Sequence, residues 1–396
     1  MVMRLPDAAW VKRADLAVLI GALGAGNARY VGGAVRDTLL GLAVKDIDIA
    51  TPLEPAEVMR RLKAHGISVI PTGIDHGTVT ALLKGGPVEI TTLRHDVSTD
   101  GRRATVAFAQ DWQDDAARRD FTINALYADP SSGEVFDWFG GWDDLRARRM
   151  RFIGDPHERI REDHLRILRY FRFQARFGSL PADPAAEQAC AELAQTLKGL
   201  SRERIGMEMM NLLGLPDPAP TVARMAELGV LQVVLPEADP AALTALVAQE
   251  QSQAVEADAL RRLAALLPAD PVLAEQIASR FRLSGAQKKR LIQAAGRGQS
   301  PLPGEVGARE ARPLAYRLGR ESALDRLLLA GASVAPLADW EVPVFPLKGG
   351  EVVARGIKAG PEVARTLRRI EERWIEAGFD DAVIPSLLDT ELAERQ

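Results

Sequence analysis

Hydrophobic and polar positions alternate along the first third of the chain, and the alternation indicates strands connected by short helices. Between residues 28 and 140, short apolar segments are separated by glycines and polar turns. The apolar segments 79–84 and 88–93 flank a Gly-Gly-Pro sequence, a spacing that predicts a β-hairpin. The pattern predicts an α+β domain built on a small mixed β-sheet.

After about residue 145 the hydrophobic period changes to that of helices. Leu165, Leu168, Phe171 and Ala175 recur at helical spacing, which predicts one long helix over residues 156–178. Proline-rich segments then separate further helical stretches, without a convincing repeat. We therefore expect an α+β head followed by an elongated all-α part, divided into a head (1–140), a helical neck (141–215) and a helical body and tail (216–396).

The composition excludes several classes of protein. Hydrophobic residues make up 47% of the 396 residues, which excludes a largely disordered chain. No apolar run approaches the ~20 residues that span a bilayer, so no membrane association is expected. The N-terminal apolar residues have helical spacing and are interrupted by Asp15, which predicts an amphipathic helix rather than a signal peptide. The single cysteine, Cys190, excludes an internal disulfide and fits a cytoplasmic protein.

The net charge of −4 argues against a protein coated in positive charge. A basic stripe is still possible within such a chain. Residues 151–180 contain seven arginines and four acidic residues, a local charge of +3.

Gly32 and Gly33 precede a helical stretch from Ala34 to Leu40. Glycine lets a backbone approach a ligand closely, and the N-terminus of a helix attracts phosphate. Arg36 would add a planar set of donors for phosphate. The alternative is a simple turn followed by a surface arginine.

Two aspartates follow at strand spacing. Asp46 and Asp48 should point to one face of a strand, while Ile47 and Ile49 point into the core. Two carboxylates ~7 Å apart along a strand can converge on a hard cation such as Mg²⁺. Glu89, in the second strand of the hairpin, is a candidate third carboxylate; alternatively it is a surface residue of an edge strand.

The segments 32–37 and 46–48 resemble the nucleotidyltransferase head, of the polymerase-β type, found in class II tRNA nucleotidyltransferases, the family of CCA-adding enzymes and bacterial poly(A) polymerases. Four further segments resemble the later motifs of this family in the same order. They are residues 118–126, 140–145, 162–166 and 202–205 together with Glu208.

The resemblance implies template-independent addition of C, C and A to the 3′ end of tRNA from CTP and ATP. Asp46 and Asp48 would hold two Mg²⁺ ions, and Glu89 would be a further catalytic carboxylate. The nucleotide would contact the glycines, Arg36 and the pair Arg118 and Arg119. The segment 95–106, expected to be a polar loop, would help to switch the pocket from cytosine to adenine.

Nucleotide selection is expected in the neck. Asp163 could accept a hydrogen bond from the amino group of cytosine or adenine, and Arg166 could donate to the ring. The alternative is an Asp163–Arg166 ion pair on a solvated helix. Arg169 and Arg172 are expected to contact phosphate or to stack on a base.

The helical tail should bind tRNA, and no protein partner is expected to be required. A basic cluster and a glycine-flanked lysine are the candidate contacts: Lys288, Lys289, Arg290 and Lys358.

Several alternatives remain open at this stage. A poly(A) polymerase and an enzyme that adds only C-C share the catalytic motifs, so these motifs cannot separate them. A non-catalytic RNA-binding protein would have lost Asp46, Asp48 or Arg36, and none is lost. A small-molecule nucleotidyltransferase would not need a long helical part. A metal-dependent phosphohydrolase is rejected because the five histidines have no ligand spacing.

Overall fold

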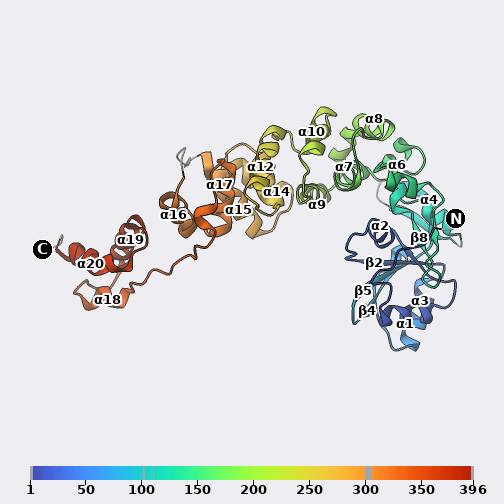
Figure 1. Ribbon diagram of the computed structural model, residues 1–396, viewed down its shortest axis with the longest axis horizontal. Coiled ribbons are helices and arrows are strands. Elements are labelled where there is room, and N and C mark those ends of the chain that lie inside the picture. Colours follow the sequence, from blue (N-terminus) through green and yellow to red (C-terminus); the bar gives the residue numbers. More distant parts are fainter. Residues whose placement is uncertain (1–2, 101–102, 110, 299–305, 394–396) are drawn as a thin grey trace. The chain divides into compact units, whose positions relative to one another are not determined.

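The computed structural model of the chain describes residues 3–100, 103–109, 111–298 and 306–393. It forms two compact units. The first comprises Met1–Leu212 and Pro220–Pro236, and the second comprises Leu213–Ala219 and Glu237–Gln396. Figure 1 shows that the strands belong to the N-terminal part of the chain, coloured blue to teal.

The first unit is organised around a mixed seven-stranded sheet with the order β3-β4-β5-β2-β1-β8-β9. Only β2 and β5 run parallel, and the other neighbouring strands in this sheet are antiparallel. The predicted hairpin is confirmed as β4 and β5. The strands are β1 (Arg29–Val31), β2 (Ile47–Thr51), β3 (Ser68–Gly73), β4 (Thr78–Leu83), β5 (Gly86–Thr92), β8 (Tyr127–Ala128) and β9 (Val135–Phe136).

Short helices surround this sheet. The predicted amphipathic N-terminal helix is confirmed as α1, which packs on α3, and α3 also contacts β3 and β4. The helices of this region are α1 (Ala14–Leu23), α2 (Gly33–Leu39), α3 (Pro55–Ala64), η1 (Ile74–His76), α4 (Trp112–Ala117), η2 (Thr122–Asn124) and α5 (Gly141–Arg146).

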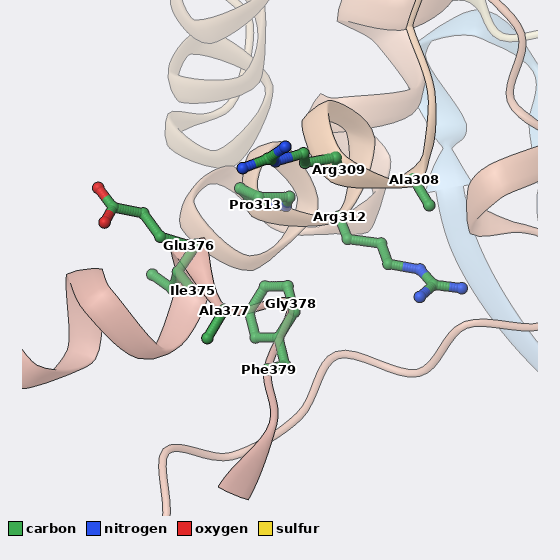
Figure 2. Close-up of a pocket in the computed structure, with 9 residues that line it drawn as sticks. All are labelled: Ala308, Arg309, Arg312, Pro313, Ile375, Glu376, Ala377, Gly378 and Phe379. Carbon is green, nitrogen blue, oxygen red and sulfur yellow. The ribbon is translucent and has the colours of Figure 1, made fainter. Parts of the chain in front are cut away.

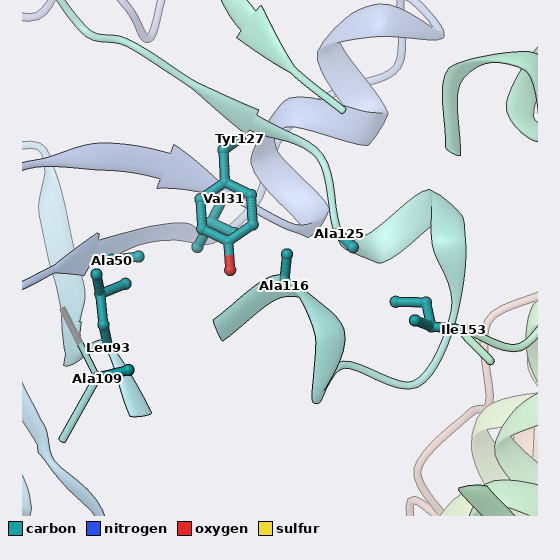
Figure 3. Packing of buried hydrophobic residues seen from close by; sticks show 8 residues of the cluster. All are labelled: Val31, Ala50, Leu93, Ala109, Ala116, Ala125, Tyr127 and Ile153. Carbon is teal, nitrogen blue, oxygen red and sulfur yellow. The ribbon is translucent and has the colours of Figure 1, made fainter. Parts of the chain in front are cut away.

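Tyr127 lies at the centre of a hydrophobic cluster beside this sheet (Figure 3). Its ring packs with Val31 of β1 and Ala50 of β2, together with Ala116 of α4. The cluster therefore joins the strand that holds Asp48 to the helix that precedes Arg118 and Arg119.

The expectation of a polar loop over residues 95–106 is wrong. The segment forms the strands β6 (Arg94–Asp100) and β7 (Arg103–Phe108), which pair antiparallel as a separate two-stranded sheet. Residues 101 and 102 lie outside the described residues. The β-branched Val97, Thr99, Thr105 and Val106 favour strands, although the polar composition indicated a loop.

From Gly141 onward, every regular element in the described part of the chain is a helix, as predicted. The first unit continues with α6 (Pro156–Glu162), α7 (Arg166–Phe177), α8 (Pro184–Glu192), η3 (Ala194–Gly199), α9 (Arg202–Leu213), α10 (Ala219–Glu227) and α11 (Val230–Val234). The second unit contains α12 (Pro240–Ser252), α13 (Ala259–Leu266), α14 (Pro271–Arg280), α15 (Gly285–Ala295), η4 (Gly296–Gly298), α16 (Ala308–Leu318), α17 (Arg320–Leu329), η5 (Ala335–Leu337), α18 (Gly349–Ala354), α19 (Pro361–Glu376), η6 (Asp381–Val383) and α20 (Ile384–Ala393).

The single long helix predicted over residues 156–178 is also wrong, because α6 ends at Glu162 and α7 begins at Arg166. Asp163 is extended, and its Oδ1 accepts a hydrogen bond from the backbone N–H of Leu165 at 3.1 Å. Such a side-chain bond competes with the helical backbone bonds and ends the helix. Residues 163–165 therefore form a turn between two helices, which we call the neck turn.

Among the described residues, no helix is both long enough and hydrophobic enough to cross a bilayer.

Candidate active site

The structure brings Asp48 and Glu89 side by side. Asp48 lies in β2 between the buried Ile47 and Ile49, and the parallel pairing of β2 with β5 places it directly opposite Glu89. Asp46 lies immediately before β2, so the strand begins one residue later than predicted. Glu89 is not on an edge strand, because β5 lies between β4 and β2.

These carboxylates affect one another. Partial burial raises the pKa of Asp48, and the charges of Glu89 and Asp46 raise it further, whereas Arg119 lowers it. Like charges gathered at one place disfavour ionisation until a cation or a positive side chain compensates them. The three carboxylates and Arg119 are therefore electrostatically coupled.

Gly32, which precedes α2, lies next to Arg119. Gly32 has φ of +66°, a conformation that side chains disfavour, and it is the N-cap of α2. A Cβ atom at this position would lie 3.3 Å from Nη1 of Arg119. Because α2 begins at Gly33, the N–H groups of its first turn have no acceptor within the helix. Glycine, arginine and carboxylates thus converge although they come from different segments.

Both arginines of the pair are held by Asp115, which sequence reasoning missed. Oδ1 of Asp115 accepts from Nε of Arg118 at 2.8 Å, and its Oδ2 lies 3.5 Å from Nη2 of Arg119. Burial raises the pKa of Asp115, but the two arginines and Tyr127 outweigh it and keep that pKa below its usual range. The i,i+3 and i,i+4 spacing was the signal that could have identified this residue.

Arg36 is buried and links α2 to η2 and to α7. Its guanidinium donates to Oδ1 of Asp37 at 2.8 Å and to Oδ1 of Asn124 at 2.5 Å, and it lies 4.2 Å from the ring centroid of Phe177. With 5% of its surface exposed, it holds α2 against η2 and α7. A contact between Arg36 and phosphate stays a prediction.

The residues expected to select the base lie at the neck turn. Asp163 does not pair with Arg166. Its Oδ2 accepts from Nη2 of Arg204 at 2.7 Å, whereas Nη1 of Arg166 donates to Oε2 of Glu162 at 2.5 Å. Nη2 of Arg166 also donates to the carbonyl of Arg118 at 3.3 Å. The neck turn is thus bonded to α9 through Asp163, and the start of α7 is bonded to the backbone of Arg118 through Arg166.

Arg169 and Arg172 make ion pairs inside the first unit. Nη2 of Arg169 donates to Oδ2 of Asp120 at 2.5 Å, and Nε of Arg172 donates to Oε2 of Glu208 at 2.6 Å. Arg172 also lies 4.6 Å from the ring centroid of Phe173. The structure gives both arginines acidic partners, and their contact with phosphate or a base stays a prediction.

The basic residues proposed for the tail differ in their surroundings. Lys289 and Lys358 are exposed. Lys288 pairs with Glu275 at 2.7 Å. Arg290 donates to Asp325, a residue with no exposed surface, at 2.6 Å through Nε. Arg290 therefore differs from Lys289, because it takes part in an ion network around the buried Asp325.

A pocket of about 330 Å³ lies in the second unit, between α16 and the end of α19 (Figure 2). Figure 2 shows Arg309, Arg312 and Pro313 extending from α16, with Glu376 and Phe379 on the opposite wall. None of the predicted site residues lines it.

Asp46 and Asp48 have the ligand chemistry that a Mg²⁺ ion requires, because they provide the carboxylate oxygens that Mg²⁺ prefers. In the described part of the chain, no three His, Cys, Asp or Glu side chains are arranged to hold a metal. Mg²⁺ in nucleotide sites is usually bound by one or two carboxylates together with substrate phosphates, and this pair fits that arrangement.

Two protein-family descriptions match the chain. The "Poly A polymerase head domain" matches residues 28–151, and the "Probable RNA and SrmB- binding site of polymerase A" matches residues 182–242.

Relatives match most of the chain. The mitochondrial CCA tRNA nucleotidyltransferase 1 of Mus musculus is 34% identical, covering 89% of this chain and 83% of its own. The CCA-adding enzyme of Latilactobacillus sakei subsp. sakei is 31% identical, covering 88% of this chain and 90% of its own. The solved Bacillus stearothermophilus CCA-adding enzyme in complex with CTP has a TM-score of 0.71 at 26% identity and covers 96% of this chain and 98% of its own. The predicted fold class and the resemblance are confirmed, and the chain belongs to the family of CCA tRNA nucleotidyltransferases.

Proposed function

We propose that this protein adds C, C and A to the 3′ end of tRNA by transferring nucleotidyl groups from CTP and ATP. The observation that carries the proposal is the convergence of Asp46, Asp48, Gly32 and Arg119 in a head that continues into the neck turn. The relatives named as CCA-adding enzymes support it. Solved CCA-adding enzymes with the same fold form complexes with CTP and with ATP.

Asp46 and Asp48 would hold the metal. Two Mg²⁺ ions there would activate the 3′-hydroxyl of the tRNA and neutralise charge on the triphosphate and on the departing pyrophosphate. Glu89 lies opposite Asp48 and adds negative charge beside these ligands. Its part would be to orient a ligand or to accept a proton, because it is exposed and close to Asp48.

Arg118 and Arg119 would bind the triphosphate. Arg119 approaches Gly32, where the lack of a side chain gives phosphate access to the backbone N–H groups at the start of α2. A planar guanidinium suits phosphate oxygens. We expect most of the affinity for the phosphates from this arginine pair, because Arg36 is buried in contacts with Asp37 and Asn124.

Asp163 and Arg166 would select the base. An ionised carboxylate has about four lone-pair sites, so Asp163 can accept from an amino group while it keeps its bonds to Leu165 and Arg204. Cytosine and adenine both carry an amino group, whereas uracil and guanine present a carbonyl that a carboxylate repels. Each mismatched contact of this kind costs ~1–3 kcal/mol.

Transfer RNA would be bound in part by the second unit. Lys289 lies on α15 and Lys358 lies between α18 and α19, and both are exposed. A lysine that contacts a phosphate releases counterions, so the affinity for tRNA should fall as the salt concentration rises. Such contacts depend on the shape of the RNA rather than on its sequence.

The deciding experiment incubates the protein with tRNA that lacks its last three nucleotides, supplying each labelled nucleotide alone and in combination, and sequences the product ends. Complete C-C-A ends support the proposal. Incorporation from ATP alone would indicate a poly(A) polymerase, and ends that stop at C-C would indicate the partial enzyme. UTP and GTP should not be incorporated.

Replacement of Asp48 by Ala tests the metal role. We expect Asp48→Ala to abolish incorporation while tRNA binding persists, because the change removes a metal ligand of the head and leaves the second unit unchanged. Chelation by EDTA should have the same effect on the unmodified protein, and added Mg²⁺ should restore activity. Unchanged turnover in the variant would exclude this role of Asp48.

A further inference from the structure

The two arginines assigned to the triphosphate share one buried partner. Asp115, in α4, has 1% of its surface exposed. Its Oδ1 accepts from Nε of Arg118 at 2.8 Å and lies 2.7 Å from Nη2 of the same residue. Its Oδ2 accepts from the hydroxyl of Tyr127 and lies 3.5 Å from Nη2 of Arg119. One carboxylate therefore holds both guanidinium groups.

The carboxylate is itself fixed in place. The backbone N–H of Arg94, the first residue of β6, points to Oδ1 of Asp115 at 3.3 Å. Tyr127, which donates to Oδ2, is packed at the centre of the cluster in Figure 3, where Ala116 of α4 is also labelled. A strand, a helix and a hydrophobic core thus fix the position of Asp115, so its orientation is set before any nucleotide binds.

The same contacts set the direction of Arg119. Its Nε donates to the hydroxyl of Tyr127 at 3.0 Å, and its Nη2 faces Asp115. The remaining nitrogen, Nη1, would lie 3.3 Å from a Cβ placed on Gly32. The charge of Asp48 also acts on Arg119. With two nitrogens held by Tyr127 and Asp115, the third is directed toward the catalytic side.

We propose that Asp115 is a positioning residue that presents Arg118 and Arg119 to the phosphates of the incoming nucleotide. The proposal rests on the proposed function, since it assumes that the arginine pair binds the triphosphate. Asp115 does not touch the nucleotide. It keeps two cations close together, and without it they would repel each other and lose a common orientation.

Asp115→Asn tests the proposal, with Asp114→Asn as the matched control. Asp114 is the exposed neighbour of Asp115 on the same helix. Each of the two variants loses one negative charge, so they differ only in the position of the change. We expect Asp115→Asn to raise KM for CTP and ATP about tenfold, as the loss of ~1.4 kcal/mol of binding would do. The inhibition constant of inorganic pyrophosphate should rise by a similar factor, and KM for tRNA should stay unchanged. The control should behave like the unmodified protein.

Tyr127→Phe provides a second, milder variant. It keeps the ring in the cluster and removes only the hydroxyl that contacts Asp115 and Arg119. We expect KM for CTP to rise by about fivefold, which corresponds to a loss of ~1 kcal/mol, the net contribution of a typical hydrogen bond. Arg118 keeps its bonds to Asp115, which is why the effect should be smaller than that of Asp115→Asn.

The outcomes separate the two proposals. If Arg119→Ala leaves KM for CTP and the pyrophosphate inhibition unchanged, the triphosphate role proposed for Arg119 fails. If Arg119→Ala weakens both but a folded Asp115→Asn does not, the positioning role of Asp115 is overturned alone. A fall in KM for CTP in Asp115→Asn would also overturn it, because the extra positive charge would then matter more than the orientation. Equal losses of CTP and tRNA affinity would point to a general defect and would contradict the proposal.

Discussion

Replacement of Gly141 by Ala tests how tightly α5 is packed against η2, the short helix that follows Arg118 and Arg119. Gly141 is the first residue of α5, and a Cβ atom there would lie 2.2 Å from the carbonyl oxygen of Thr122 in η2. Ordinary contact begins at about 3.4 Å, so the two backbones would have to separate by 1.2 Å, the difference between these distances. Thr122 cannot move freely, because its hydroxyl donates to Asp144 at 2.6 Å and its N–H donates to the carbonyl of Arg151 at 3.1 Å.

The expected cost follows from this geometry. Overpacking typically costs about 1–3 kcal/mol, and the upper end applies here because the obstacle is backbone rather than a flexible side chain. Replacing Gly by Ala also reduces the entropy of the unfolded chain, which offsets about 0.4–1 kcal/mol. We therefore expect the free energy of unfolding to fall by about 2 kcal/mol.

The single cysteine supplies the assay. Cys190 lies in α8 of the same compact unit, has no exposed surface and is the only cysteine of the chain. Burial also raises the pKa of its thiol, so the native protein should resist alkylation. Brief labelling with a maleimide at increasing urea concentrations therefore reports unfolding of this unit. With a urea dependence of about 2 kcal/mol per molar, the labelling midpoint of Gly141→Ala should fall by ~1 M.

Gly21→Ala is the matched control. Gly21 lies within α1, and a Cβ there meets nothing within 4 Å. Ala is favoured over Gly inside a helix by about 1 kcal/mol, so this variant should unfold at the same or a higher urea concentration. If Gly141→Ala shows the midpoint of the unmodified protein, then α5 and η2 do not pack as described and the reasoning is refuted.

Further predictions concern the ion pairs. Burial raises the pKa of Asp120, but Arg169 and Asn124 outweigh burial and hold this pKa below its usual range. The stability that ionised Asp120 provides should therefore be present above pH ~4 and be lost as the pH falls through the pKa of Asp120 in the native protein. The difference in urea midpoint between the unmodified protein and Asp120→Asn should accordingly shrink below pH ~4, and a difference independent of pH would contradict the prediction. Arg290→Met should destabilise the second unit by about 3 kcal/mol in urea unfolding without changing the salt dependence of tRNA binding, because it removes a partner of the buried Asp325. Lys289→Met should leave the stability unchanged and should lower the slope of log tRNA affinity against log salt concentration by about one. The opposite pattern for these two variants would refute the structural role of Arg290 and the RNA-binding role of Lys289.

Local sequence patterns predicted the elements around the candidate catalytic carboxylates. Alternation gave the hairpin of β4 and β5, and Ile47 and Ile49 are buried on either side of Asp48 as the strand period requires. Residues that alternate along a strand face opposite sides whatever the rest of the fold does. A strand signal is thus complete within a few residues, which explains why this prediction was confirmed.

Side-chain partners could not be predicted in the same way. Arg36 bonds to Asn124, which is 88 residues away in the chain, and Arg169 bonds to Asp120, 49 residues away. An arginine on a helix face has the same local pattern whether it faces solvent or a buried carboxylate. The pairing of Arg290 with Asp325 could not be predicted for this reason, since Asp325 lies on a different helix.

Breaks in regular structure were also decided outside the local pattern. Residues 157–177 contain neither glycine nor proline, so nothing in this segment marked the end of α6 at Glu162. The turn depends on Asp163, whose carboxylate accepts hydrogen bonds from the backbone N–H of Leu165 and from Arg204 of α9. Its geometry is therefore set by a helix that begins only at Arg202.

The sequence by itself determined the α+β head, the change to helices after residue 145 and the candidate catalytic carboxylates. These depend on periodicity and on residue types that only a few chemistries require. Tertiary structure alone decided that Tyr127 donates to Asp115, that Arg36 is buried and that Asp163 pairs with Arg204. The physical reason is that an ion pair needs two groups at hydrogen-bonding distance, and only the packing of distant segments determines which groups meet.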